Sequence, residues 1–241
     1  MPNNVEKMTF NYSPNFDTIK RKKKQIKYLI FHYTGMKNDQ LSIKKLTSEK
    51  SKVSCHYYID KEGKLIQMVP ESYIAWHAGK SKWGKDNLLN KNSIGIEISN
   101  TGHENNYEKF NKAQINCLIK ISRKLIKKYK IKKKNILGHS DIAPLRKKDP
   151  GEKFPWKFLS TKNIGLWHKI NLANLKKLRR EKIDSEINFF LKLLKKFGYY
   201  TKYSDSNELK KIIKTFQRRF RPELVNGNLD KECLEILKSL I

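Results

Sequence analysis

The chain has 241 residues, of which 38% are hydrophobic and 32% are charged, and no apolar run approaches the roughly 20 residues of a membrane-spanning helix. This composition fits a soluble protein with one domain of about 170 residues and a second, small one. Lysine and arginine (53) exceed aspartate and glutamate (23), which gives a net charge of +30. The basic residues are scattered over both halves, so we discount nucleic acid as a partner. An anionic polymer or a membrane surface would be an equally good partner for a protein with this positive charge.

Neither the cysteines nor the N-terminus indicates export. Cys55, Cys117 and Cys233 are far apart and odd in number, so they predict no disulfide framework. The first residues lack the basic-then-apolar pattern of a secretory signal, and no lipidation cysteine lies near them. Taken alone, this favours the cytoplasm.

The first half of the chain is predicted to be rich in β-strands. Residues 1–24 are polar and turn-rich and are expected to form an extended lead-in. A buried strand is expected over 26–32 and a short helix over 42–49. Two antiparallel strands, 55–60 and 64–69, flank a glycine-containing hairpin connection. The segment between them and the next strand reads as loop, including residues 75–79 and 81–91.

One acidic residue, Glu97, interrupts the apolar strand expected over 93–99. One interpretation is a partly exposed strand edge. The alternative is a carboxylate that points into a cleft, where loss of solvation raises its pKa and suits it to act as a general base. The sequence pattern leaves both interpretations open.

Apolar residues recur at spacings of three and four over 111–129, which predicts an amphipathic helix. A return strand follows at 136–138, an extended loop comes after it, and the chain then reads as loop from 157 to 168. A β-rich half that is closed by a helix and a return strand favours an α/β fold, with a mixed central β-sheet flanked by helices.

The character of the chain changes beyond residue 182, where three short segments each carry apolar residues on one helical face. Gly198 is expected to end the first helix, and Asp230 to cap the last. We therefore expect a lead-in over 1–24, a catalytic domain over 25–180 and a small C-terminal three-helix domain over 181–241.

Three candidate metal ligands lie at or after the ends of predicted strands. His32 ends the first strand, His139 ends the return strand, and Asp149 follows ten positions later, just before Pro150. Two imidazoles and one carboxylate leave a fourth position for water, which is the pattern of a catalytic zinc site. A single histidine at a strand end is more often a hydrogen-bonded structural residue, and the spacing alone does not bring His32 and His139 together.

Six motifs give these residues a context. They are Phe31-His32-Tyr33-Thr34, Ser54-Cys55-His56-Tyr57, Ala75-Trp76-His77-Ala78-Gly79, Asn92-Ser93-Ile94-Gly95-Ile96-Glu97, Gly138-His139-Ser140-Asp141-Ile142-Ala143-Pro144 and Arg146-Lys147-Lys148-Asp149-Pro150-Gly151. In their order and spacing, they resemble the zinc-dependent N-acetylmuramoyl-L-alanine amidases of the type-2 amidase family. The match runs from about residue 25 to 170.

The resemblance implies that His32, His139 and Asp149 bind Zn²⁺ and that Glu97 and Lys147 are catalytic. It implies the mixed sheet of the family, with the zinc at the floor of a groove. The implied reaction is hydrolysis of the amide bond between N-acetylmuramoyl, ordinary or 1,6-anhydro, and L-alanine in peptidoglycan or muropeptides, during cell-wall turnover or recycling. The alternative is a non-catalytic peptidoglycan-recognition protein. Loss of a ligand would mark that class, and none is lost here.

Tyr33, Trp76 and His77 are expected on the substrate side of the site. Trp76 could stack on a sugar face, although buried packing explains it as well. For His77 we favour a contact with substrate or with a metal ligand over ligation, because three protein ligands complete a catalytic site. His56, inside a strand, is expected to be structural, and His103 has no context that singles it out.

The helical tail resembles the peptidoglycan-binding module that members of the family carry, in Phe216-Gln217-Arg218-Arg219-Phe220-Arg221-Pro222 and Asn226-Gly227-Asn228-Leu229-Asp230. Such a module has little use where no polymer exists, so we expect the periplasm or outer envelope, with the cytoplasm as the alternative. The expected partners are peptidoglycan or muropeptides, with no nucleic acid and no transmembrane segment, and the protein is expected to be a monomer.

Overall fold

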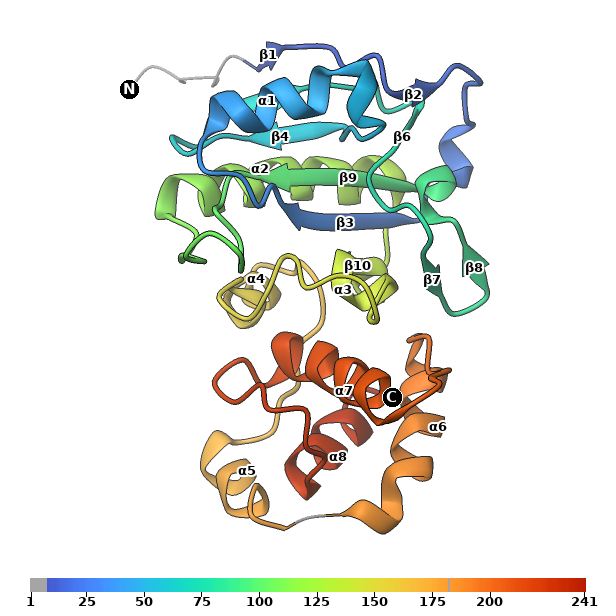
Figure 1. Cartoon of the computed structure of the whole chain (residues 1–241), viewed down its shortest axis with the longest axis vertical. Coiled ribbons are helices and arrows are strands. Elements are labelled where there is room, and N and C mark those ends of the chain that lie inside the picture. Colours follow the sequence, from blue (N-terminus) through green and yellow to red (C-terminus); the bar gives the residue numbers. More distant parts are fainter. Residues whose placement is uncertain (1–7, 182) are drawn as a thin grey trace.

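The structure, a computed structural model, describes residues 8–181 and 183–241, and its centre is a six-stranded mixed sheet (Figure 1). Only β4 and β5 pair antiparallel, and the other neighbours run parallel. In spatial order the strands are β1 (Thr9–Phe10), β5 (Leu65–Gln67), β4 (Tyr57–Ile59), β9 (Ser93–Ile98), β3 (Tyr28–Tyr33) and β10 (Ile136–Gly138). The predicted mixed sheet is confirmed.

The register of the three adjacent parallel strands β9, β3 and β10 places the candidate site. His32 on β3 lies opposite Glu97 on β9, and Phe31 lies opposite Gly138, so that His139 follows at the same level. Parallel strands present their carboxyl ends at one edge of a sheet, where ligands of α/β proteins commonly bind. Residues more than 60 positions apart in the sequence therefore meet there.

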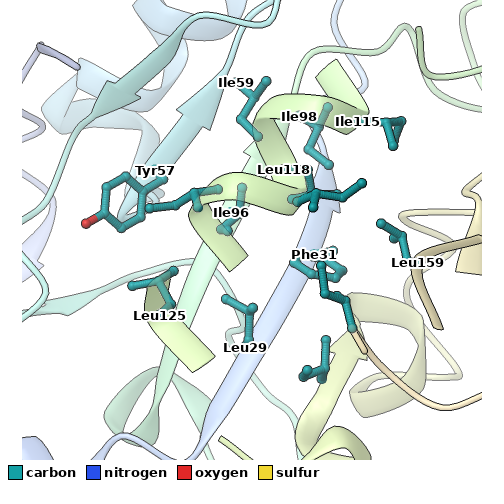
Figure 2. Close-up of a cluster of buried hydrophobic side chains, with 14 of the residues drawn as sticks. Leu29, Phe31, Tyr57, Ile59, Ile96, Ile98, Ile115, Leu118, Leu125 and Leu159 are labelled. Carbon is teal, nitrogen blue, oxygen red and sulfur yellow. The ribbon is translucent and has the colours of Figure 1, made fainter. Parts of the chain in front are cut away.

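Side chains of β3 alternate between two hydrophobic clusters, as the two-residue period of a strand requires. Leu29 and Phe31 belong to a cluster with Leu118 and Leu125 of helix α2 (Lys112–Tyr129), and Figure 2 shows this helix crossing the strands. The side chain of Asn111 accepts a hydrogen bond from a backbone N–H and so caps the first turn of α2.

Ile30 belongs to the second cluster, which also contains Leu137 of β10 together with Phe216 and Phe220 of the C-terminal part. That part consists of α6 (Ile187–Phe197), α7 (Ser206–Phe220) and α8 (Lys231–Lys238), which are the three expected helices, and of α5 (Leu172–Leu178), which precedes the expected boundary at residue 181. These helices form a layer beyond the edge strand β10 (Figure 1). The sheet and the C-terminal helices therefore share one apolar core.

Several helices differ from the sequence-based expectation. Helix α1 (Asp39–Thr47) begins earlier than expected, because Asn38 caps it by accepting the Leu41 N–H at 2.9 Å. A four-residue helix, α3 (His139–Ile142), replaces the extended loop that was expected after β10. The stretch expected as loop contains α4 (Trp156–Thr161), whose Trp156 and Leu159 are buried.

Short strands also form where loop was expected. Strand β2 (Phe16–Asp17) of the lead-in pairs with β6 (Ile74–Ala75), and β7 (Lys82–Trp83) pairs with β8 (Asp86–Asn87). Strand β1 adds the lead-in to the sheet edge, while residues 1–7 of that expected segment lie outside the described residues. Short 3-10 helices complete the chain at Lys23–Gln25, Glu49–Ser51, Leu89–Asn92, Lys133–Asn135 and Asp184–Glu186. Over the described residues, no helix is both long and apolar enough to cross a membrane.

Candidate active site

Three potential ligand atoms converge at the carboxyl edge of the sheet. His32 Nδ1 and His139 Nδ1 are 3.0 Å apart, and each lies 3.1 Å from Asp149 Oδ2. All three side chains are buried. The residues that the sequence marks as candidate ligands thus form one cluster.

This triangle fits a zinc ion. Zinc binds imidazole nitrogen and carboxylate oxygen at about 2.0–2.2 Å, and tetrahedral ligands at that distance are separated by about 3.3–3.6 Å. The observed separations of 3.0–3.1 Å are only slightly shorter. Three lone pairs that face one another at this range would repel without a shared cation, so the donor set suits a metal with one open position.

A backbone contact favours one tautomer of His139. Its Nε2 lies 3.1 Å from the carbonyl oxygen of Ala78, which can only accept, and 3.3 Å from Arg146 Nη2, which can only donate; the shorter contact favours a proton on Nε2. The neutral ring then presents the lone pair of Nδ1 to the candidate metal position. Metal-ligating histidines usually donate their other ring N–H to such an acceptor.

A chain of hydrogen bonds fixes His32 in the same way. The Ser93 hydroxyl donates to the carbonyl oxygen of Leu89, so Ser93 Oγ accepts from His77 Nε2 at 3.1 Å. His77 Nδ1 is then free to accept from His32 Nε2 at 3.0 Å. Because His32 Nε2 then carries the ring proton, His32 Nδ1 is unprotonated and its lone pair faces the cluster.

Gly95 makes room for the His77 ring. A Cβ atom at position 95 would lie 2.4 Å from the ring of His77, closer than any real carbon contact. The same glycine donates its N–H to His56 Nδ1 at 3.0 Å, which gives His56 a structural contact in line with the expectation for it. The Ile94-Gly95-Ile96 part of the fourth motif therefore has a packing reason.

Burial favours the neutral form of His32 and His77. Desolvation and the neighbouring His139 lower the pKa of His32 to about 4, and desolvation lowers the pKa of His77 well below its usual range. Burial alone would raise the pKa of Asp149, but its close contacts with His139 and His32 hold it well below its ordinary value. Neutral imidazole and ionised carboxylate are the forms that bind metal.

Glu97 lies beside this cluster, with Oε1 4.0 Å from His32 Nδ1. Its other oxygen, Oε2, is buried and has no hydrogen-bond partner among the described residues. Burial and the charge of Asp149 raise the pKa of Glu97 well above its usual range. Of the two interpretations of Glu97, the structure supports the carboxylate in a cleft, where its raised proton affinity suits a general base.

A cleft of about 350 Å³ opens over the cluster. Tyr33, Trp76 and Lys147 are among the side chains that line it, so the structure brings the expected substrate-side and catalytic residues together. The indole Nε1 of Trp76 donates to Asp17 at 2.7 Å, which holds the ring at the wall of the cleft. His77 also reaches the cleft, but both its ring nitrogens already have partners.

The sequence interpretation missed three residues of the cleft. His103 contacts the Tyr33 hydroxyl through Nδ1 at 2.8 Å. Arg146 donates to the carbonyl oxygens of Ala78 and Lys80 at 2.7 and 2.9 Å. Lys45 reaches the cleft from α1. Arg146 lies in a quoted motif, whereas no pattern around His103 or Lys45 marks them.

A mixed sheet with a His-His-Asp set at its carboxyl edge and a buried glutamate beside it is typical of metal-dependent hydrolases. The chain belongs to the N-acetylmuramoyl-L-alanine amidase family, because the model of that family matches residues 22–152. The family resemblance and the family fold inferred from the sequence are thereby confirmed.

Individual relatives extend the similarity beyond the family model. The chain is 36% identical to the N-acetylmuramoyl-L-alanine amidase AmiD of Escherichia coli, over 90% of this chain and 83% of AmiD. The structure of E. coli AmiD with anhydro-N-acetylmuramic acid-L-Ala-D-gamma-Glu-L-Lys superposes with a TM-score of 0.81 at 35% identity, over 90% of this chain and 88% of that one. The structure of AmpDh3 of Pseudomonas aeruginosa in complex with anhydromuramic pentapeptide superposes with a TM-score of 0.78 at 29% identity, over 99% of this chain and 96% of that one. The likeness therefore includes the C-terminal helices.

Proposed function

We propose that the chain hydrolyses the amide bond between an N-acetylmuramoyl group and L-alanine, with zinc held by His32, His139 and Asp149. The observation that carries this proposal is the convergence of two imidazole nitrogens and one carboxylate oxygen, within 3.1 Å of one another, at the floor of a cleft. Membership of the amidase family supports the bond that is cleaved. A non-catalytic recognition protein would not need Glu97 beside a complete set of ligands.

The roles of the surrounding residues follow from their positions. Zinc, when bound there, supplies a Lewis acid that lowers the pKa of water from about 15.7 toward roughly 7. Glu97, whose Oε1 lies 4.0 Å from His32 Nδ1, takes a proton from the attacking water and passes it to the leaving amine. Lys147 lines the cleft two residues before Asp149, and its ammonium group stabilises the oxygen that becomes negative.

The walls of the cleft suit an acidic sugar-peptide. Lys45, Arg146 and Lys148 bring positive charge to it, and Tyr33 and Trp76 offer aromatic surface for substrate. AmiD and AmpDh3 have each been solved with an anhydromuramyl peptide. We therefore include 1,6-anhydro as well as ordinary muramyl peptides among the substrates, in wall turnover or recycling. For His77 we propose support of His32, because its ring nitrogens are already engaged.

We further propose that residues 25–180 carry the chemistry and that residues 181–241 bind peptidoglycan polymer. The motifs of the tail and the net charge of +30 support a location in the periplasm or outer envelope, where an anionic polymer is present. The three candidate ligands belong to one chain, so the proposed reaction needs no second subunit, and we propose a monomer. Fractionation of native cells tests the location, and recovery only with cytoplasmic markers would contradict it.

Product identification tests the proposed reaction. Purified protein is incubated with anhydro-muropeptides and, separately, with intact sacculi, and the products are identified by mass spectrometry. We expect free muramyl sugar from the soluble substrate and stem peptides with a new N-terminal L-alanine from both substrates. Binding of sacculi without cleavage of either substrate, by protein that holds zinc, would favour the recognition protein instead.

A further inference from the structure

A buried carboxylate connects the metal site with the C-terminal helices. Asp141, only 1% exposed, lies on α3 two residues after His139. Its Oδ2 accepts the backbone N–H of Gly138 at 2.8 Å, which holds the start of the helix. Asp141 also receives two hydrogen bonds from side chains that are more than 50 residues away in the sequence, Tyr199 and Arg219.

Arg219 of α7 is almost fully buried, and its guanidinium group holds both α3 and the edge strand. Nη1 makes a short ion pair with Asp141 Oδ2, while Nη2 donates to the carbonyl oxygen of Ile136 on β10 at 2.9 Å. The guanidinium also lies 4.2 Å from the centre of the Trp156 ring. Among the described residues, Asp141 is the only carboxylate within ion-pair distance of Arg219. Removal of either Asp141 or Arg219 would therefore leave the charge of the other buried without an ion-pair partner.

Tyr199 adds a hydrogen bond to the other carboxylate oxygen. Its hydroxyl donates to Asp141 Oδ1 at 2.5 Å, and its ring packs against Trp83, with centroids 4.8 Å apart. Burial and the charge of Asp141 raise the pKa of Tyr199 well above its usual range, so the hydroxyl stays a donor. Arg219 and Tyr199 together satisfy both oxygens of Asp141 from the C-terminal side.

The position of α3 affects two ligands. The helix carries His139 itself, and the N–H of Ser140 donates to the carbonyl oxygen of Asp149 at 2.8 Å. Gly138 packs so closely on Pro150 that a Cβ there would lie 2.5 Å from the proline ring. A shift of α3 would therefore move His139 and the Asp149 backbone relative to His32, which is held separately on β3.

We propose that Arg219 and Tyr199 are positioning residues for the metal site: by holding Asp141 they fix α3, and α3 sets the distance between His139, Asp149 and His32. In this role the C-terminal helices help to form the catalytic centre, besides any contact they make with polymer. The inference rests on the proposed zinc function. It depends on the side-chain contacts of Asp141, and not on resemblance of the tail to a binding module.

The test compares Tyr199→Phe with Tyr57→Phe in the full-length protein. Tyr57 is a matched control, because it is also buried and also donates to a buried carboxylate, Glu71, but is not among the described residues that line the cleft. Zinc dissociation constants are measured by competition with a chromophoric chelator, well below the melting temperature of each variant. Amide hydrogen exchange of residues 138–142 is measured in the metal-free proteins.

We expect both variants to melt at a lower temperature than the unchanged protein. Only Tyr199→Phe should weaken zinc binding, by roughly 3- to 10-fold, in keeping with the loss of one buried hydrogen bond. It alone should also speed exchange at residues 138–142. Arg219→Lys, which keeps the charge but cannot hold Asp141 and the Ile136 carbonyl together, should weaken zinc binding further.

Two results together would overturn the inference and leave Tyr199 a purely stabilising role. The first is a zinc dissociation constant of Tyr199→Phe within twofold of that of the unchanged protein. The second is amide exchange at residues 138–142 that is no faster in Tyr199→Phe than in Tyr57→Phe. Failure of the unchanged protein to bind zinc would instead overturn the proposed function. The exchange measurement would still decide whether Tyr199 holds α3, because it needs no metal.

Discussion

Replacing His139 with alanine is expected to abolish both zinc binding and amide hydrolysis. In the proposed zinc site His139 supplies one of three ligand atoms, and loss of it leaves His32 and Asp149, which are too few to hold a catalytic zinc. Removal of an outer hydrogen-bond partner of a metal ligand typically lowers activity by about 10- to 100-fold. Removal of the ligand itself should lower activity by about ten times more than that. Metal content by atomic emission and hydrolysis of a soluble muropeptide are the two measurements.

His168→Ala is the matched control for this variant. His168 is also a buried histidine, but it stacks on Trp167 and lies outside the cleft. This control should keep both zinc and activity, whatever it costs in stability. Zinc retained at full stoichiometry by His139→Ala would show that His139 is not a ligand.

Glu97→Gln is expected to keep zinc but to lose activity by about 10²- to 10⁴-fold, the range that a general base contributes. Glutamine preserves the shape of the side chain and removes its ability to take a proton. Among the described residues the Oε2 atom of Glu97 has no hydrogen-bond partner, so an amide group in its place breaks no contact and should fit without rearrangement. Lys147→Ala should also retain zinc and lower the rate by about 100-fold, through the loss of charge near the reacting oxygen.

Glu104→Gln provides the comparison, because it removes the same charge at the exposed rim of the same cleft. Its effect on the rate should stay within a few-fold, since an exposed charge acts on the site only through screened solvent. Steady-state rates and zinc content are measured for all three variants. Insoluble Glu97→Gln together with fully active Lys147→Ala would mean that Glu97 is structural and that Lys147 takes no part in the reaction.

The cluster of three candidate ligands could be predicted because its residues stand in motifs tied to strand ends. His32 and His139 end predicted strands, and the parallel register of β3 and β10 then brings them together. The register itself could not be read from the sequence, because it depends on contacts between segments more than 100 residues apart. The role of Glu97 stayed open for the same reason, since only the pairing of β9 with β3 places it opposite His32.

Contacts around the ligands escaped the sequence interpretation. The chain from Ser93 through His77 to His32 consists of side chains that no local spacing relates. Helix α3 is too short to show a helical period, and its start depends on Asp141 accepting the N–H of Gly138.

Helices α6, α7 and α8 were recognisable from their apolar faces, whereas α5 was not predicted, and neither was the surface that the C-terminal helices pack against. Their amphipathic pattern predicts that each helix buries one side, and it does not name the surface that covers this side. The clue lay in the first strand, where Tyr28 to Phe31 are all apolar. Such a continuous run indicates a strand that is buried on both faces. One face meets α2, and the other belongs to the core shared with Phe216 of α7.

Zinc titration of the metal-free protein is the most direct test of whether hydrolysis depends on zinc. Metal is removed with a chelator, retention of the fold is checked by circular dichroism, and zinc is then added stepwise while hydrolysis of an anhydro-muropeptide is followed. We expect no hydrolysis without metal and full activity at one equivalent of zinc. The fold should stay intact, because the sheet and helix core does not depend on a catalytic ion. Full activity in the metal-free protein would contradict the proposed zinc site.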